Sequence, residues 1–169
     1  THHASSAASD VYKRQLWIGG SSEAAIERSG KYGTGWQAAF DTPEEAGVVV
    51  EKILHAAERN SRPMDKDHFS AGFGVRFGCW EDEPVKKMAE DFEKRTGKEA
   101  SRGIVVGNGD QILERIQSYV DNGVSKFILR PIGIGDEEMF EQTEQIIEDV
   151  LNKSDQLLDC LLYTSPSPR

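Results

Sequence analysis

Short apolar runs alternate with amphipathic stretches along most of the chain. Runs rich in aromatic and β-branched residues predict four strands, at residues 16–18, 36–40, 69–77 and 126–130. The third run contains two glycines, which is typical of a bent or bulged strand. Each run is followed by a stretch whose apolar residues have helical spacing, so the pattern predicts alternating strands and helices.

The amphipathic stretches carry start and stop signals of helices. They predict helices over residues 23–29, 43–60, 84–95, 110–122 and 136–151. Thr42 is an expected N-cap, with Pro43 in the first turn and Glu45 completing a capping box. Asn108 and Asp136 are the expected N-caps of the last two helices. Six apolar side chains of the last helix are expected to face the core: Met139, Phe140, Ile146, Ile147, Val150 and Leu151.

Four strands that are each followed by a helix predict an α/β fold with a parallel sheet and right-handed crossovers. Two closures of such a sheet fit the pattern. One is a small open doubly wound sheet. The other is half of a (β/α)8 barrel, since a whole barrel needs eight strands and typically about 250 residues. Periodicity leaves both closures open.

The two ends differ in composition from the rest of the chain. The segments SDVYKRQ at residues 9–15 and CLLYTSPSPR at residues 160–169 resemble adapter-derived reading frames at the edges of assembled sequences. Natural disordered tails are the alternative. We therefore expect tails at residues 1–15 and 158–169, and one partial barrel domain over residues 16–157.

Composition and charge argue against several kinds of binding partner and location for this chain. The chain has 169 residues and a net charge of −9, from 29 acidic and 20 basic residues, and no basic stripe, which argues against nucleic acid. It has no apolar run of 18 residues, so we expect no membrane span. Cys79 and Cys160 do not form a disulfide framework, and a cytoplasmic location is the simpler expectation. His55 and His68 lack a second ligand at i+3 or i+4, so no metal site is expected.

The most informative stretch for chemistry follows the first predicted strand. Gly19 and Gly20 end that strand, and Ser21 or Ser22 is placed to cap the next helix. Glycines let backbone N–H groups approach a ligand closely, and a helix start offers unpaired donors and a positive dipole end. The pattern suits a phosphate group. A plain tight turn between strand and helix is the alternative.

Three motifs carry a resemblance to a known family. The segment LWIGGSSEAAIERSGKYGTGW at residues 16–36, VGNGDQI at 106–112 and YVDNGVSKFIL at 119–129 resemble, in order, passages of the bacterial luciferase-like family. The chain departs from the family pattern at three positions. Gln15 stands where a proline is usual, Thr34 where an aspartate is usual, and Gly109 where a proline is usual.

The resemblance implies a fold, a cofactor and a site. It implies the C-terminal half of a TIM barrel that holds FMN or the 8-hydroxy-5-deazaflavin coenzyme F420 at the carboxyl ends of its strands. The cofactor site would then comprise five residues: Gly19, Gly20, Ser21, Gly35 and Trp36.

Two arginines are weaker candidates for the same end of the barrel. Arg76 and Arg130 lie at the ends of the third and fourth predicted strands, where a guanidinium pairs well with an anionic substrate or a phosphate. A structural ion pair with one of the many acidic residues is the alternative for both.

The implied function is that of a luciferase-like oxidoreductase or monooxygenase acting on a small organic molecule. The sequence shows no nucleophile–base pair or carboxylate dyad, and the catalytic residues are expected to lie in the other half of the barrel. An isomerase or aldolase on a phosphate-binding barrel is one alternative, although Lys126 stands at a strand start rather than a strand end. A non-catalytic acidic interaction module is the other. A half-barrel has open edges, so we expect poor solubility or dimers that complete a barrel.

Overall fold

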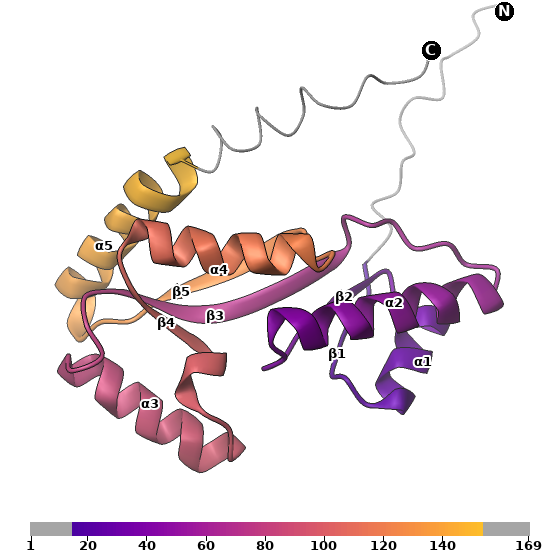
Figure 1. Ribbon diagram of the computed structural model, residues 1–169, viewed down its shortest axis with the longest axis horizontal. Coiled ribbons are helices and arrows are strands. Elements are labelled where there is room, and N and C mark those ends of the chain that lie inside the picture. Colours follow the sequence, from indigo (N-terminus) through magenta and orange to yellow (C-terminus); the bar gives the residue numbers. More distant parts are fainter. Residues whose placement is uncertain (1–14, 154–169) are drawn as a thin grey trace, which may run out of the picture.

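A computed structural model describes residues 15–153 of the chain. It contains one parallel sheet of five strands (Figure 1). The strands are β1 (Trp17–Gly19), β2 (Gly35–Gln37), β3 (Phe69–Phe77), β4 (Ile104–Gly107) and β5 (Lys126–Pro131). The helices are α1 (Glu23–Tyr32), α2 (Pro43–Arg59), α3 (Glu83–Thr96), α4 (Gly109–Asp121) and α5 (Gly135–Ile146). A short 3-10 helix, η1 (Ala100–Arg102), precedes β4, and a π-helical turn, η2 (Ile147–Leu151), continues α5.

The four predicted strands lie parallel and in the predicted order. β1 pairs with β2, β2 with β3, and β3 with β5, with no antiparallel pair among the described residues. The number of strands was wrong, because β4 is a fifth strand. β4 pairs with Gly74–Phe77 of β3. Gly74 pairs with both Ile104 and Arg130, and Ser70 with both Gln37 and Lys126, so β2 and β4 share one edge of β3 and β5 takes the other.

Most helix signals hold, and three bounds need correction. Thr42 and Asn108 each form a complete capping box, and Pro43 begins α2 as expected. The first helix is longer than predicted and ends at Tyr32, whereas β2 ends early, at Gln37. Asp136 is not an N-cap: it lies in the first turn of α5, where its charge still suits the helix dipole.

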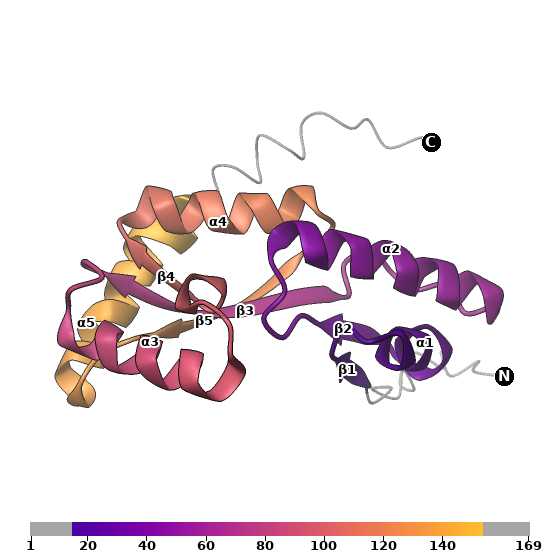
Figure 2. The same ribbon diagram turned by 60° about the horizontal axis from the view of Figure 1, so that its bottom comes forward.

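Helices cover the two faces of the sheet unequally. α2 and α4 pack on one face, and α3 crosses the other (Figure 2). The larger core lies under α2 and α4 and includes Trp36, Phe69 and Phe73, each at most 1% exposed. The smaller core lies under α3 and includes Phe92 and Ile132.

The last helix buries less than the sequence predicted. Ile146 and Val150 are buried, and Met139 is half-buried. Phe140, Ile147 and Leu151 were expected in the core but are 69%, 45% and 49% exposed. The reason is geometric: Gln142, Ile146 and Val150 recur every four residues, so a single narrow stripe of the helix meets the rest of the described chain.

Some of the predictions concern residues that the structure does not describe. The predicted tails at residues 1–15 and 158–169 lie almost wholly outside the described residues, and so does Cys160. Within residues 15–153 no helix is long and apolar enough to cross a membrane.

Candidate functional site

The turn after β1 has the backbone that the glycine pattern predicted. Gly20 has a φ of +95°, a conformation that side chains disfavour. Ser22, rather than Ser21, is the N-cap of α1, and its side-chain oxygen accepts a hydrogen bond from the Ala25 N–H at 3.3 Å. The loop therefore ends directly at a helix N-terminus whose first N–H groups have no partner within the helix.

Trp36 holds this turn from inside the core. Its indole Nε1 donates to the Gly20 carbonyl oxygen at 2.9 Å, and its side chain is 0% exposed. The peptide bonds of the described chain are trans, so the Ser21 N–H points away from the Gly20 carbonyl and hence away from the core. Trp36 itself has no surface for a cofactor to contact, and it positions the loop instead.

Asp41 is a neighbour of the glycine turn that the sequence analysis did not identify. The Ser21 hydroxyl donates to Asp41 Oδ1 at 2.5 Å, and the Ala39 N–H donates to Asp41 Oδ2 at 3.2 Å. The Tyr119 hydroxyl donates to the Asp41 backbone carbonyl at 2.6 Å. Ser21 thus gives its one hydroxyl proton to a carboxylate, and only its backbone N–H remains to serve an anion. An acid directly after the second predicted strand was the available signal.

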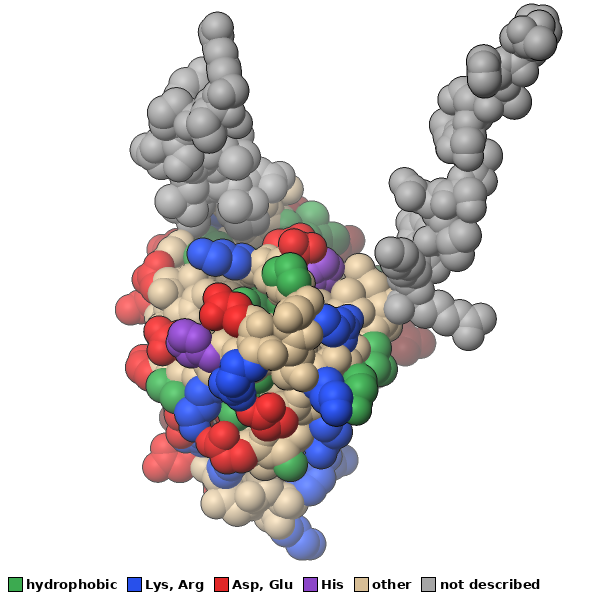
Figure 3. All heavy atoms as spheres, turned by 90° about the vertical axis from the view of Figure 1, so that its right-hand side faces the viewer, with side chains coloured by type: hydrophobic (Ala, Val, Ile, Leu, Met, Phe, Trp, Pro, Cys, Tyr) green, Lys and Arg blue, Asp and Glu red, His purple; other side chains and the backbone are tan. Residues whose placement is uncertain are grey.

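A cavity of about 590 Å³ opens beside Ser21 and Asp41. Three basic side chains line it: Lys52, Lys98 and Arg102. Lys52 pairs with Glu23 at 2.6 Å, and Arg102 pairs with Glu45. Lys98 forms no ion pair with any residue in the range 15–153. On the side of the molecule where α1 and the end of α2 lie, basic and acidic side chains are interspersed (Figure 3).

Gly35 lies at the other end of its strand from this turn. It begins β2 and pairs with Trp17, and a Cβ added to it would lie 2.7 Å from the Trp17 ring. The residue beside Gly19 in the sheet is Gln37. Gly35 therefore makes room for an indole at the amino end of the strands, and the neighbouring strand end is formed by Gln37.

Arg76 forms structural ion pairs, which was the alternative to a ligand-binding role. Its Nε lies 3.2 Å from Asp82 Oδ2, its Nη1 lies 2.6 Å from Glu138 Oε1, and Nη1 also donates to the Ile132 carbonyl at 3.0 Å. The side chain is 11% exposed. Two carboxylates compensate its charge, so it joins the start of α3 to the start of α5 and is not free for a ligand.

Hydrogen bonds from neighbouring groups, and next the contacts with Arg76, lower the pKa values of both acids. The pKa of Glu138 is lowered chiefly by the Ile134 N–H that donates to it, and next by Arg76. The pKa of Asp82 is lowered by the thiol and the backbone N–H of Cys79, and next by Arg76. In turn, the hydrogen bond to Asp82 raises the pKa of the Cys79 thiol, which argues against a reactive thiolate.

Arg130 has a different environment from Arg76. It is exposed, and its Nη2 makes one long hydrogen bond, of 3.4 Å, to the Gly72 carbonyl. No ion pair of Arg130 is present within residues 15–153. It lies on the face of the sheet that α3 crosses, as its place beside Gly72 requires.

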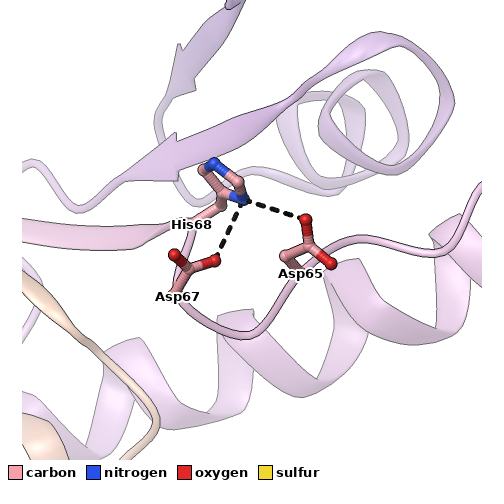
Figure 4. A group of neighbouring side chains, drawn as sticks. All are labelled: Asp65, Asp67 and His68. Atoms are coloured by element: carbon pink, nitrogen blue, oxygen red, sulfur yellow. Dashed lines mark ion pairs between the residues drawn. The ribbon is translucent and has the colours of Figure 1, made fainter.

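Asp65, Asp67 and His68 gather at the amino end of β3 (Figure 4). His68 Nδ1 lies 3.7 Å from Asp65 and 3.2 Å from Asp67. The sequence argument looked only at positions i+3 and i+4 of each histidine and so missed both acids. For His55 it was wrong, because Glu58 stands at i+3, with its Oε2 3.7 Å from His55 Nδ1. Lys126 Nζ lies 3.3 Å from Asp67 Oδ2, so an ammonium group already neutralises this carboxylate. We assign no metal to the cluster.

Comparisons with known proteins support the fold. No protein-family model and no curated protein matches the chain. An F420-dependent secondary alcohol dehydrogenase, solved with an F420–acetone adduct, has a TM-score of 0.60 and 11% identity over 80% of this chain and 48% of its own. The coenzyme F420-dependent tetrahydromethanopterin reductase from Methanopyrus kandleri has a TM-score of 0.55 and 17% identity over 82% and 50%. The EDTA monooxygenase from Chelativorans sp. BNC1 has a TM-score of 0.56 and 14% identity over 80% and 44%.

These similarities confirm the expected fold class. The chain has the fold of half of a luciferase-like (β/α)8 barrel, and it spans about half the length of the structures it resembles. At sequence identities of 11–17%, the similarity establishes the fold of this chain and no further property of those enzymes.

Proposed function

We propose that this chain is part of a luciferase-like oxidoreductase, and that its Gly19–Gly20–Ser21 turn binds the phosphate group of FMN or of the deazaflavin coenzyme F420. Such a cofactor carries the hydride or oxygen chemistry on a small organic substrate, while the protein binds and orients it. The similar structures include F420-dependent enzymes and monooxygenases, which favours this class of reaction.

One observation carries the proposal: the orientation of the Gly20–Ser21 peptide. Trp36 draws the Gly20 carbonyl inward, and the Ser21 N–H therefore faces outward at the start of α1. The next N–H groups belong to the first turn of the helix, where the dipole favours an anion. Lys98 stands at the cavity beside them. A donor set of backbone N–H groups and one unpaired ammonium fits a phosphate.

The remaining residues of the turn have supporting roles. Asp41 fixes the Ser21 side chain, so the hydroxyl does not rotate when a ligand binds. Gly19 and Gly20 leave the backbone bare at the carboxyl end of β1. Gly35 and Trp36 lie outside the proposed site, because Gly35 is at the amino end of β2 and Trp36 is fully buried. A reducing compartment such as the cytoplasm suits the free thiol of Cys79.

A titration that compares FMN with riboflavin tests the phosphate site, because the two molecules differ only by the phosphate group. A charge-assisted hydrogen bond contributes roughly 1.5–3 kcal/mol, and the helix dipole about 0.3–1 kcal/mol. We expect FMN to bind at least about tenfold more tightly than riboflavin, measured by flavin fluorescence. Gly20→Val should remove most of this difference.

The matched control is Gly135→Val. Gly135 also has a positive φ, of +75°, and a Cβ there would meet nothing within 4 Å, but it lies at the start of α5. The control should leave the preference for FMN intact. Equal affinities for FMN and riboflavin in the unmodified chain would show that the glycine turn only connects a strand to a helix.

A further inference from the structure

A second cavity, of about 790 Å³, lies on the opposite face of the sheet from α2 and α4. One wall is a stripe of α3 that includes Lys87, Met88, Asp91 and Arg95. The other wall is the carboxyl end of β5 with the residues that follow it. No residue lines both this cavity and the one beside Ser21, so the two are separate. We refer to it as the α3–β5 cleft.

The floor and walls of the cleft are apolar. They comprise six large side chains: Phe40, Met88, Phe92, Ile104, Ile132 and Ile134. Phe92, Ile104 and Ile132 belong to the smaller core and are fixed there, whereas Met88 is 42% exposed and Ile134 is 64% exposed. The cleft thus offers a rigid apolar base with an open side, and its volume lies within the range of small-molecule sites, about 300–1,000 Å³.

The charges around the cleft oppose the charge of the chain. Lys87, Arg95 and Arg130 line it, against a single acid, Asp91. Within residues 15–153, none of these four side chains takes part in an ion pair. The whole chain carries a net charge of −9, so three cations against one acid at one cavity are a local exception. A cavity with low-dielectric walls strengthens their field.

Gly72 explains how Arg130 reaches the cleft. A Cβ added at Gly72 would lie 3.3 Å from Arg130 Nη1, so the guanidinium rests on bare backbone. Its one hydrogen bond, to the Gly72 carbonyl, is long at 3.4 Å and leaves the other donors of the guanidinium uncommitted. Arg76, one strand away, has its Nε and Nη1 paired with carboxylates. Of the two arginines at strand ends, Arg76 is therefore paired with carboxylates, whereas Arg130 is available to bind a ligand.

We propose that the α3–β5 cleft binds a small amphipathic carboxylate. The apolar body of the ligand packs on Met88, Phe92 and Ile132, and its carboxylate pairs with Arg130. A planar guanidinium matches a carboxylate with two parallel hydrogen bonds, which favours this anion. Lys87 and Arg95 add positive potential at the rim. This site goes beyond the proposed function, because neither its residues nor its test involves the cofactor turn.

Binding of 1-naphthoate and of its neutral isostere 1-naphthamide to the 169-residue chain tests the proposal. Isothermal titration at pH 7 should give at least about tenfold tighter binding of naphthoate, as expected for one charge-assisted contact. The preference should shrink as salt is added, because screening weakens exposed charges. Arg130→Met should bring the two affinities within about threefold of each other.

Two matched controls separate recognition from a general loss of charge. Lys126→Met removes a cation from the same strand, outside the cleft, and should keep the preference for naphthoate. Lys87→Met should weaken naphthoate binding more than Lys86→Met, since only Lys87 lines the cleft. This second pair remains decisive if circular dichroism shows that Arg130→Met has unfolded the chain. Equal binding of the two ligands, no binding of either, or equal effects within both variant pairs would overturn the proposal.

Discussion

The two faces of the sheet differ in what covers them and in the side chains they carry. On the face under α2 and α4, Phe69 and Phe73 of β3 are buried among aromatic and branched residues. On the opposite face, β3 presents Gly72 and Gly74, and β5 presents the exposed Ile128 and Arg130. Alternate residues of one strand point to opposite faces. The strand that stabilises the fold therefore also shapes the cleft, with separate residues for each.

The largest expected effect comes from the covered face. Phe73 is 1% exposed and stacks on Tyr119 with 6.0 Å between ring centroids, so Phe73→Ala should cost about 3–5 kcal/mol in free energy of unfolding. Ile128 is 53% exposed, and Ile128→Ala should cost less than about 1 kcal/mol. Urea denaturation followed by circular dichroism measures both. Similar costs would mean that the second face is as well packed as the first.

The next effect concerns the ion pairs of Arg76 and is seen in acid. The pKa values of Asp82 and Glu138 are lowered from ordinary values of 3.8 and 4.5 in the folded chain. Groups with a lowered folded pKa stabilise the fold above their unfolded pKa, and this contribution is lost as the pH falls through the folded value. The thermal midpoint should therefore drop as the pH falls below about 4.5.

Arg76→Met identifies the origin of that drop. Without the guanidinium, the variant should be less stable at pH 7 and should show a smaller loss between pH 5 and pH 3. Lys52→Met serves as the control, because Lys52 pairs with Glu23 far from these acids. An acid loss of unchanged size in Arg76→Met would assign the pH dependence to the other donors to these two acids, the Ile134 N–H and Cys79, or to other carboxylates.

A smaller effect is expected on self-association. Within the described residues β1 and β5 each pair along one edge only, and the face around Ile128 is open. We expect the chain to associate at micromolar concentration, as seen by light scattering, because open edges and apolar faces are prone to pairing. Ile128→Lys should reduce association more than Val48→Lys, although the two side chains are 53% and 55% exposed. A monomer at all concentrations would contradict this prediction.

The smallest effect should come from the surface pair of Lys52 and Glu23. The two groups lie 2.6 Å apart, but their side chains are 49% and 76% exposed. Exposed pairs typically contribute about 0–1 kcal/mol. Lys52→Met should change the free energy of unfolding by less than about 0.5 kcal/mol in urea denaturation. A larger change would give the pair a role in holding α1 against α2.

Local signals predicted much of the fold. The capping boxes at Thr42 and Asn108 are contacts between residues three positions apart, and sequence records such contacts directly. The bounds of β3 were also predicted in full, because its aromatic and β-branched run is long. β4 was missed because its residues, Ile104–Gly107, directly precede a strong helix start at Asn108, which dominates the local pattern.

The site was harder to predict, because it depends on contacts between distant residues. The glycine turn was located from its own residues. The register that puts Gln37 rather than Gly35 beside Gly19 comes from strand pairing, and so does the burial of Trp36. Whether Arg76 or Arg130 is free depends on Asp82 and Glu138, which reach Arg76 from two different helices. The strand register and the pairing of Arg76 depend on residues far apart in the sequence, so the pattern along the chain does not reveal them.

The hydrogen bond from Trp36 to Gly20 has a spectroscopic consequence. An indole proton that is fully buried and donated to a carbonyl exchanges with deuterium only when the structure around it opens. That carbonyl belongs to the turn after β1, so each opening of the turn exposes this one proton. Its exchange rate, followed by NMR, measures how often the turn opens in the absence of any ligand. A ligand that holds the turn closed would slow the exchange without touching the tryptophan.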